Sequence, residues 1–95
     1  MHHRYKMKFW AKAFRDNRMT ADTVVEDLSA DTRTHKVFGA LETISYRFDI
    51  PRPIWLDSNI ADFKRYSKVR FYADSFIEEV PFDYLEFMVL EEDMG

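Results

Sequence analysis

Apolar and polar side chains alternate along residues 5–13, which is the two-residue period of a strand with one buried face. One set is Tyr5, Met7, Phe9, Ala11 and Ala13, and the other is Lys6, Lys8, Trp10 and Lys12. The sequence Asp16-Asn17-Arg18 favours a turn, because Asp and Asn tolerate left-handed backbone. Residues 20–26 are β-branched at their centre, so we expect the two segments to form a hairpin.

A helical period replaces the alternation after Asp31. The apolar positions recur every three or four residues, at Val37, Leu41, Ile44 and Phe48. They predict one apolar stripe along about four turns. Asp31 is a suitable N-cap, with Ser29 as the alternative. We expect the helix to end near Asp49, because the residue before Pro51 disfavours helical backbone.

A short second helix is predicted over about 58–67, where it would bury Ile60 and Phe63. Residues 68–73 fit either a continuation of this helix or a strand. We favour the strand, because Val69 would fall on the wrong side of a continued helix.

Two more strands are predicted toward the C-terminus. Residues 76–80 are one candidate, and Pro81 would place it at an edge or a bulge. Residues 84–92 are apolar on both sides, which is typical of a central strand or of one covered on both faces. The element order predicts the α+β class: an antiparallel sheet with one main helix and a short second helix packed on one face, in a single domain over 1–95.

The composition agrees with one small core and excludes cysteine chemistry. The chain has 95 residues, 17% of them aromatic, and no cysteine, so disulfides, thiolate metal sites and cysteine nucleophiles are excluded. Apolar runs are too short for a signal peptide or a membrane span. We therefore expect a cytoplasmic protein with no membrane partner, in which residues 1–4 are flexible or derived from an expression tag.

No motif predicts catalysis. His35 is the only histidine outside the first three residues, and neither a nucleophile motif, a phosphate-binding glycine loop nor a metal-ligand spacing accompanies it. We expect no catalytic residue, no cofactor and no metal site.

Charge along the chain is sorted into blocks. Six bases and one acid lie in the first 18 residues, whereas the last 25 carry eight acids and no base. If the terminal strands are neighbours, Lys6, Lys8 and Lys12 would face Glu86 and Glu92 across the ladder. Alternatively, the acids form a negative surface for a basic partner, with the candidate partner-binding residues Glu78, Glu79, Asp83, Glu86, Glu91 and Glu92.

Residues 63–72 interleave bases with aromatic rings, as nucleic-acid-binding surfaces do. The candidate residues for this alternative are Lys64, Arg65, Tyr66, Lys68, Arg70 and Tyr72. The formal net charge of −3 favours a solvated edge with inward aromatic rings instead. Trp10 and Phe14, opposite the apolar set of the first strand, suit an interface or a sheet covered on both faces.

Several segments resemble short uncharacterised bacterial proteins, a resemblance that implies no activity. They are Pro53-Ile54-Trp55-Leu56-Asp57-Ser58-Asn59-Ile60, Phe63-Lys64-Arg65, Arg70-Phe71-Tyr72, Phe76-Ile77 and Phe82-Asp83-Tyr84-Leu85-Glu86. The sequence favours a non-enzymatic binding or regulatory module that acts by protein–protein contact, as a homodimer or on a basic partner. One version is a phage or mobile-element inhibitor of a basic nucleic-acid-binding protein, and the alternative is a nucleic-acid-binding module.

Overall fold

The N-terminal hairpin forms as the alternation predicts. In a computed structural model that describes residues 6–93, strand β1 (Lys6–Arg15) pairs antiparallel with β2 (Arg18–Asp27). Asp16 and Asn17 join the strands with φ of 52° and 64°, the left-handed backbone that these residue types tolerate. The prediction about residues 1–4 falls outside the described residues.

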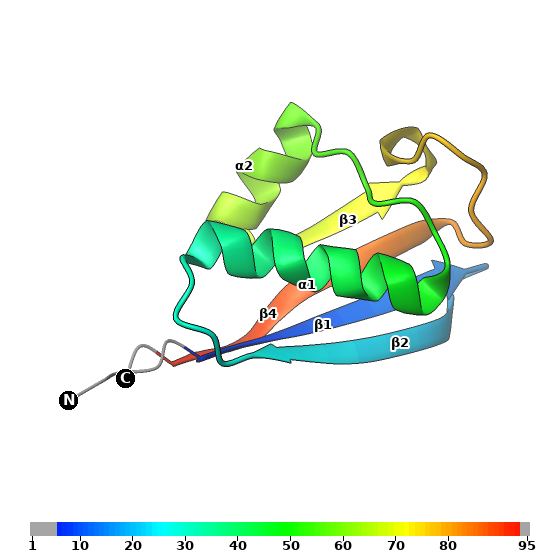
Figure 1. Ribbon diagram of the computed structural model, residues 1–95. Helices are drawn as coiled ribbons and strands as arrows, with labels where there is room; N and C mark the ends of the chain where they lie inside the picture. Colours follow the sequence, from blue (N-terminus) through cyan, green and yellow to red (C-terminus); the bar gives the residue numbers. More distant parts are fainter. Residues whose placement is uncertain (1–5, 94–95) are drawn as a thin grey trace.

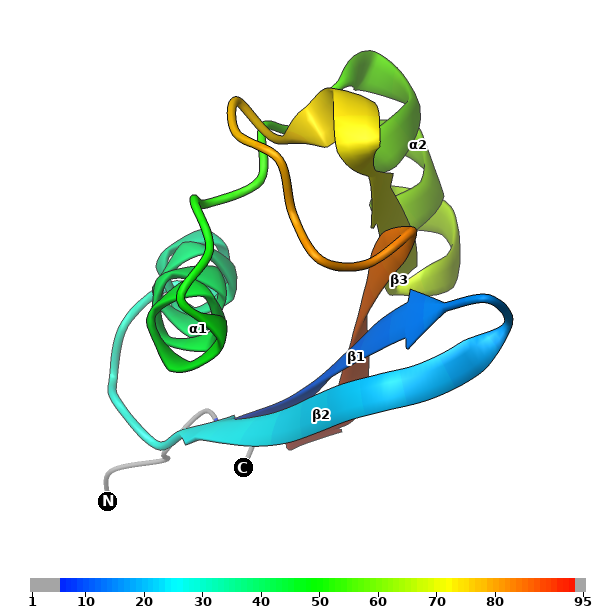
Figure 2. The ribbon, with the colours of Figure 1, turned by 90° about the vertical axis from the view of Figure 1, so that its right-hand side faces the viewer.

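Two C-terminal strands complete an antiparallel sheet of order β2-β1-β4-β3. Strand β4 (Tyr84–Asp93) lies between β1 and β3 (Lys68–Tyr72). Helix α1 (Arg33–Phe48) lies over one face of the sheet, and α2 (Asp57–Tyr66) lies along β3 (Figures 1 and 2). The predicted α+β class, the central position of the last strand and the strand after residue 67 are confirmed.

Helix α1 faces the sheet with its apolar stripe and is capped at both ends. The stripe consists of buried Val37, Leu41 and Ile44 and half-buried Phe48. The N-cap is Thr32, rather than Asp31 or Ser29, and its Oγ1 accepts a hydrogen bond from the His35 N–H (3.2 Å). The helix ends at Asp49, as predicted, with φ of 54°.

Helix α2 is fixed to β3 by the buried side chain of Asn59. Its Oδ1 accepts from the Leu56 N–H (2.9 Å), and its Nδ2 donates to the Arg70 carbonyl oxygen (3.2 Å). Phe63 is buried as predicted, whereas Ile60 is 38% exposed. The expectation for Ile60 was wrong because α2 lies at the border of the sheet and turns only a narrow side into the core.

The predicted strand over 76–80 is wrong. A 3-10 turn at Ala73–Ser75 and an irregular loop occupy this part of the chain. The Ile54 N–H donates to the Ser75 carbonyl oxygen (2.7 Å), and the rings of Phe76 and Phe82 pack edge to face with centroids 5.5 Å apart. Buried aromatic anchors therefore hold the loop at both ends, in place of a hydrogen-bonded ladder.

Aromatic rings occupy the centre of the core. Phe87 of β4 stacks on Phe9 of β1 (5.3 Å between centroids) and on Phe63 of α2 (5.7 Å). Trp55, in the connection between the helices, packs edge to face on Phe63 (5.5 Å) and Phe71 (5.0 Å). These rings join the sheet, α2 and the interhelical connection into one core.

The Trp55 indole offers a test of this packing. Its Nε1 is buried and, within residues 6–93, has no hydrogen-bond partner. Trp55→Phe removes an unpaired donor and keeps an aromatic ring, so we expect the free energy of unfolding in urea to stay within about 1 kcal/mol of the parent value. Trp55→Ala, the control, should cost clearly more. Equal losses for the two variants would contradict a contribution of aromatic packing at this position.

Lys36 of α1 is buried, with no exposed surface. Its Nζ donates to the carbonyl oxygens of Ser29 (2.6 Å) and Asp27 (3.3 Å) and lies 3.4 Å from Asp27 Oδ1. These oxygens belong to the connection between β2 and α1. The buried ammonium group therefore fixes the start of α1 against the end of β2.

Side chains also bond carbonyl groups on both edge strands. Arg47 of α1 donates from Nη1 to the Val24 carbonyl oxygen of β2 (2.9 Å), and Asn59 bonds the Arg70 carbonyl oxygen of β3. The pairing of β1 with β2 also shifts register between Ala13 and Phe14. Such features hinder addition of a further strand, so contacts with other molecules are expected on the faces of the fold.

Candidate functional site

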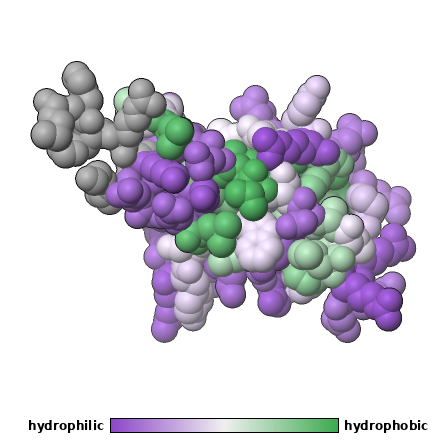
Figure 3. All heavy atoms as spheres, turned by 90° about the horizontal axis from the view of Figure 1, so that it is seen from below, coloured by the Kyte–Doolittle hydropathy of each residue, from purple (hydrophilic) through white to green (hydrophobic). Residues whose placement is uncertain are grey.

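The sheet has one face turned away from the helices, here called the open face. Residues paired across an antiparallel sheet share a face. The register therefore groups the residues of the open face into rows across the strands, and apolar rows alternate with charged rows. The rows are Met19, Phe14, Tyr84 and Tyr72; Asp22, Lys12, Glu86 and Arg70; Val24, Trp10, Met88 and Lys68; and Glu26, Lys8 and Glu91. Figure 3 shows apolar residues in green among charged ones in purple on the underside of the molecule.

Aromatic rings on the open face contact one another across the strands. Phe14 stacks on Tyr84 (5.0 Å between centroids), and Tyr84 lies against Tyr72 (5.4 Å). Trp10 donates from Nε1 to Asp22 Oδ2 (2.9 Å), and Lys12 Nζ lies 4.1 Å from the Trp10 ring centroid. Neighbouring side chains therefore fix the orientation of these rings before any partner binds.

Three residues of the central charged row, Lys12, Glu86 and Arg70, form an ion-pair network. Glu86 is only 5% exposed, and it pairs with Lys12 Nζ (3.1 Å) and Arg70 Nε (3.0 Å). Burial acts to raise the pKa of Glu86, but hydrogen bonds from Lys12 and Arg70 outweigh burial and hold this pKa below its ordinary value of 4.5. The carboxylate thus stays ionised and pairs with a base on each side.

This network predicts a pH dependence of stability. Because the folded-state pKa of Glu86 is lowered, its contribution is complete above the unfolded-state pKa and is lost as the pH falls through the folded-state value. We expect Glu86→Gln to cost about 1–2 kcal/mol at pH 7, reduced by the exposure of Arg70. In urea titrations from pH 7 to pH 3, the gap between parent and variant should close at low pH, and a constant gap would contradict the network. Glu79→Gln, in the exposed loop, is the matched control.

A second set of ion pairs explains much of the charge sorting. Lys8 Nζ lies 3.7 Å from Glu26 and 3.5 Å from Glu91, and Lys6 Nζ lies 3.9 Å and 3.6 Å from the same two carboxylates. The lysines of β1 therefore face acids of both neighbouring strands. The strand-pairing hypothesis predicted this only for the last strand, with Glu86 and Glu92 as the partners, and of these Glu86 pairs with Lys12.

Glu92 is the exception to that hypothesis. The register shifts between Lys8 and Phe9, so that Leu90 is the extra residue of β4 and Glu92 lies opposite Met7 on the helix side. There Glu92 pairs with Arg33 of α1 (3.3 Å). A one-residue bulge exchanges the faces of the residues beyond it, and so it separates Glu92 from the lysines.

The structure does not gather the six predicted partner-binding acids into one surface. Glu86, Glu91 and Glu92 are in the ion pairs described above, and Asp83 Oδ2 accepts a hydrogen bond from the Asp16 N–H (2.9 Å). Glu78 and Glu79 lie exposed in the loop between the 3-10 turn and β4. An extended negative surface along the C-terminal segment is therefore absent from the described residues.

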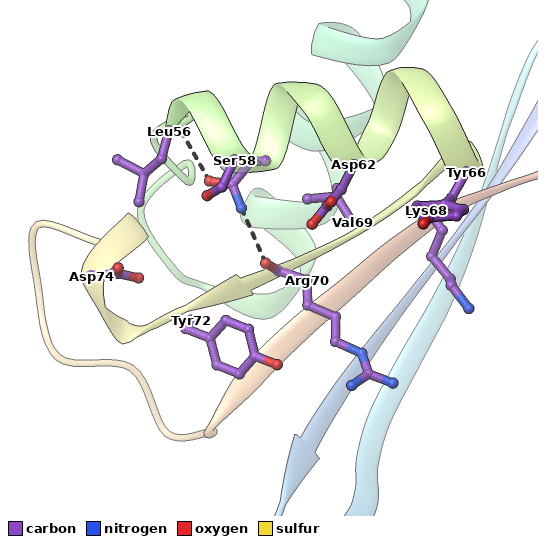
Figure 4. A pocket seen from close by; sticks show the side chains of 10 residues that line it. Leu56, Ser58, Asp62, Tyr66, Lys68, Val69, Arg70, Tyr72 and Asp74 are labelled. Atoms are coloured by element: carbon purple, nitrogen blue, oxygen red, sulfur yellow. Dashed lines mark hydrogen bonds between the residues drawn. The ribbon is translucent and has the colours of Figure 1, made fainter.

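The predicted nucleic-acid residues are divided between two sides of α2. Lys64 borders a groove between the helices, and the Arg65 guanidinium lies 5.4 Å from the Tyr66 ring centroid. The remaining residues line a hollow between α2 and β3, where Asp62 and Asp74 also lie. Figure 4 shows Lys68 and Arg70 extending away from α2. Lys64 and Arg65 thus lie outside this hollow, and Lys68 and Arg70 share it with two carboxylates.

Sequence reasoning identified Trp10 and Phe14 but missed Tyr84 and Met88 as members of the same surface. The sequence feature that could have identified Tyr84 and Met88 is the apolar character of both sides of the last strand. That feature fits an exposed interaction face and a strand covered on both faces equally well. The arrangement of helices decides between the two, because α1 and α2 leave this face of the sheet uncovered.

The described residues contain one Asp–His pair and no metal-ligand group. His35 Nδ1 lies 2.8 Å from Asp31 Oδ1, and this hydrogen bond lowers the pKa of Asp31. Both side chains are exposed. Within residues 6–93, no group of three or more His, Cys, Asp or Glu side chains is arranged to hold a metal ion, and no helix is long and apolar enough to cross a membrane.

Comparison with known proteins gives no further assignment. No family model, no curated protein and no solved structure matches this chain. The function is therefore inferred from the geometry of the open face alone.

Proposed function

We propose that the protein is a non-enzymatic binding module of the cytoplasm that acts by protein–protein contact through the open face. The observation that supports this proposal is the set of fixed aromatic rings around Trp10 and Tyr84, on a sheet face that both helices leave uncovered. Trp, Tyr, Met and Arg are enriched at protein interfaces, and Trp, Tyr and Arg are enriched among the residues that dominate binding energy.

The charges of the open face favour a partner of mixed charge. Lys12 and Arg70 are both paired with Glu86, and Lys6 and Lys8 are paired with Glu26 and Glu91. A strongly basic partner, such as the target of the inhibitor that the sequence suggested, requires unpaired acids, which Glu78 and Glu79 alone supply among the six candidates. The face therefore supports recognition by aromatic contact and complementary ion pairs rather than by net charge.

Nucleic-acid binding is the second candidate. It is supported by the hollow of Figure 4, whose lining includes exposed Tyr66, Tyr72 and Lys68. The carboxylates of Asp62 and Asp74 line the same hollow and would repel phosphate groups. This candidate consequently has weaker support than protein contact.

The experiment is affinity capture from the native host with open-face variants, read by quantitative mass spectrometry. We expect Trp10→Ala and Tyr84→Ala each to reduce recovery of a specific partner about tenfold or more, as for a central interface residue. Tyr46→Ala is the matched control, because Tyr46 on α1 is 87% exposed and lies off the open face. Urea denaturation of each variant verifies that it remains folded.

An RNA-binding assay on the same purified protein distinguishes nucleic-acid binding from protein contact. Retention of single-stranded RNA that falls steeply with salt and is abolished by Lys68→Glu and Arg65→Glu would support nucleic-acid binding. A partner recovered equally by Trp10→Ala, Tyr84→Ala and the parent protein would contradict docking on the open face.

A further inference from the structure

A second apolar surface lies between the helices, away from the open face. The groove has a volume of about 270 Å³, and its residues include Arg33, Phe38, Trp55, Ile60, Phe63 and Lys64. Phe38 is 51% exposed although its ring packs edge to face on Trp55, 6.3 Å away. A solvated groove with an aromatic floor is suited to an inserted apolar side chain.

Two basic side chains border this groove. Arg33 comes from the first turn of α1 and Lys64 from the last turn of α2. Arg33 also lies over the Phe63 ring, with its guanidinium carbon 5.5 Å from the ring centroid. Arg33 is already paired with Glu92 (3.3 Å), so Lys64 is the base that a partner would meet. The chemistry that fits the groove is therefore an apolar side chain with carboxylates next to it.

The chain itself presents that combination in the loop between the 3-10 turn and β4. Ile77 is 77% exposed, and Glu78 and Glu79 follow it directly, both exposed. Phe76 and Phe82 anchor this loop in the core on either side. The loop thus holds an apolar side chain and two acids outward from fixed ends.

The loop and the groove lie at opposite ends of α1. The groove involves Arg33 to Phe38, whereas Pro81 and Phe82 lie beside Phe48 at the other end of the helix. Ten helical residues separate these ends by about 15 Å, and Figure 1 shows the loop on the right and the start of α1 on the left. Ile77 is therefore held outside the groove of its own molecule, where it is exposed.

We propose that copies of this protein associate head to tail, with Ile77 of one copy in the groove of the next and Glu78 and Glu79 beside Lys64. Such a contact is heterologous, so one copy at each end of the assembly keeps an unused loop or groove and the assembly can grow. A loop-sized contact belongs to the weak class of interfaces. Association is therefore expected at protein concentrations of about 10–100 µM and above.

Sedimentation equilibrium with complementary variants tests this assembly. Ile77→Asp places a third acid at the tip of the loop, and Phe38→Asp places an acid in the groove. We expect the average mass of the parent protein to rise with concentration beyond that of a dimer, whereas either variant alone remains monomeric. An equimolar mixture of the two should stop at a one-to-one dimer, because one intact loop and one intact groove remain between them.

The controls separate this inference from the proposed function and from misfolding. Tyr46→Asp adds an acid to an exposed aromatic position at the far end of α1 and should assemble like the parent protein, and so should the open-face variant Trp10→Ala. Lys64→Glu, at an exposed position of α2, should also abolish self-association, although it leaves the apolar floor of the groove unchanged. Glu78→Lys with Glu79→Lys should restore association when mixed with Lys64→Glu.

Three results would overturn the inference. They are a parent protein that stays monomeric at about 1 mM, an Ile77→Asp variant that assembles as the parent does, and a mixture of Ile77→Asp and Phe38→Asp that stays monomeric. Assembly lost with Trp10→Ala but kept with Ile77→Asp would assign self-association to the open face instead.

Discussion

Replacing Phe87 with alanine is expected to lower the free energy of unfolding by about 3–5 kcal/mol. Phe87 has no exposed surface, and its ring stacks on Phe9 and on Phe63. Truncation leaves a cavity at the point where β1, β4 and α2 meet. Helix α2 cannot easily move to fill this cavity, because Asn59 holds the helix to β3. Urea denaturation at pH 7 measures the loss.

Tyr46→Ala is the matched control for this prediction, because it removes a similar ring from an exposed position. Its expected change is within about 0.5 kcal/mol. A loss below about 1 kcal/mol for Phe87→Ala would show that the stacked rings are not the centre of the core.

Lys36→Met is expected to cost about 3 kcal/mol. Methionine retains most of the apolar stem of Lys36, so the loss reports the ammonium group and the oxygens that it leaves unpaired at Ser29 and Asp27. Removing one partner from a buried ionic hydrogen-bond set is costly because the other groups stay desolvated. Hydrogen exchange should locate the loosening at the β2–α1 connection and the first turns of α1.

Lys64→Met is the control for Lys36→Met, since it removes the same group from an exposed position on α2. Its expected change in the free energy of unfolding is within about 0.5 kcal/mol. If the two variants were equally stable, the buried ammonium group would contribute nothing that a methionine cannot replace.

The elements with a clear period were predictable from the sequence. The alternation through Phe9 and Ala11 defines β1, and the spacing of Leu41 and Ile44 defines α1, because one buried face imposes each pattern. Val69 decided in favour of β3 by the same argument. These local patterns fixed the fold class without any knowledge of tertiary contacts.

Other features depend on contacts between distant residues and could not be predicted. The bulge at Leu90 moves Glu92 to the helix side, and no local sequence signal locates it. The burial of Lys36 depends on carbonyl groups that the preceding connection turns toward it. The loop over 76–80 has the composition of a strand, yet Phe76 serves as an anchor in the core.

The candidate surface was predictable only in part. The position of Trp10 opposite the buried residues of β1 was evident from the alternation. Its neighbours Tyr84 and Met88 required the register between β1 and β4, and their accessibility required the position of both helices. The ion pairs of Glu86 with Lys12 and Arg70 likewise depend on tertiary structure. The acidic segment of the sequence therefore did not reveal that this carboxylate is paired within the fold.

Fluorescence of Trp10 in the Trp55→Phe variant tests the docking of a partner on the open face most directly, because Trp10 is then the only tryptophan in the chain. Titration with the captured protein partner should shift the Trp10 emission toward shorter wavelength as the indole is buried, with the same midpoint as binding followed by anisotropy of a label on the partner. Saturating binding with no change in Trp10 emission would contradict the open face as the docking surface.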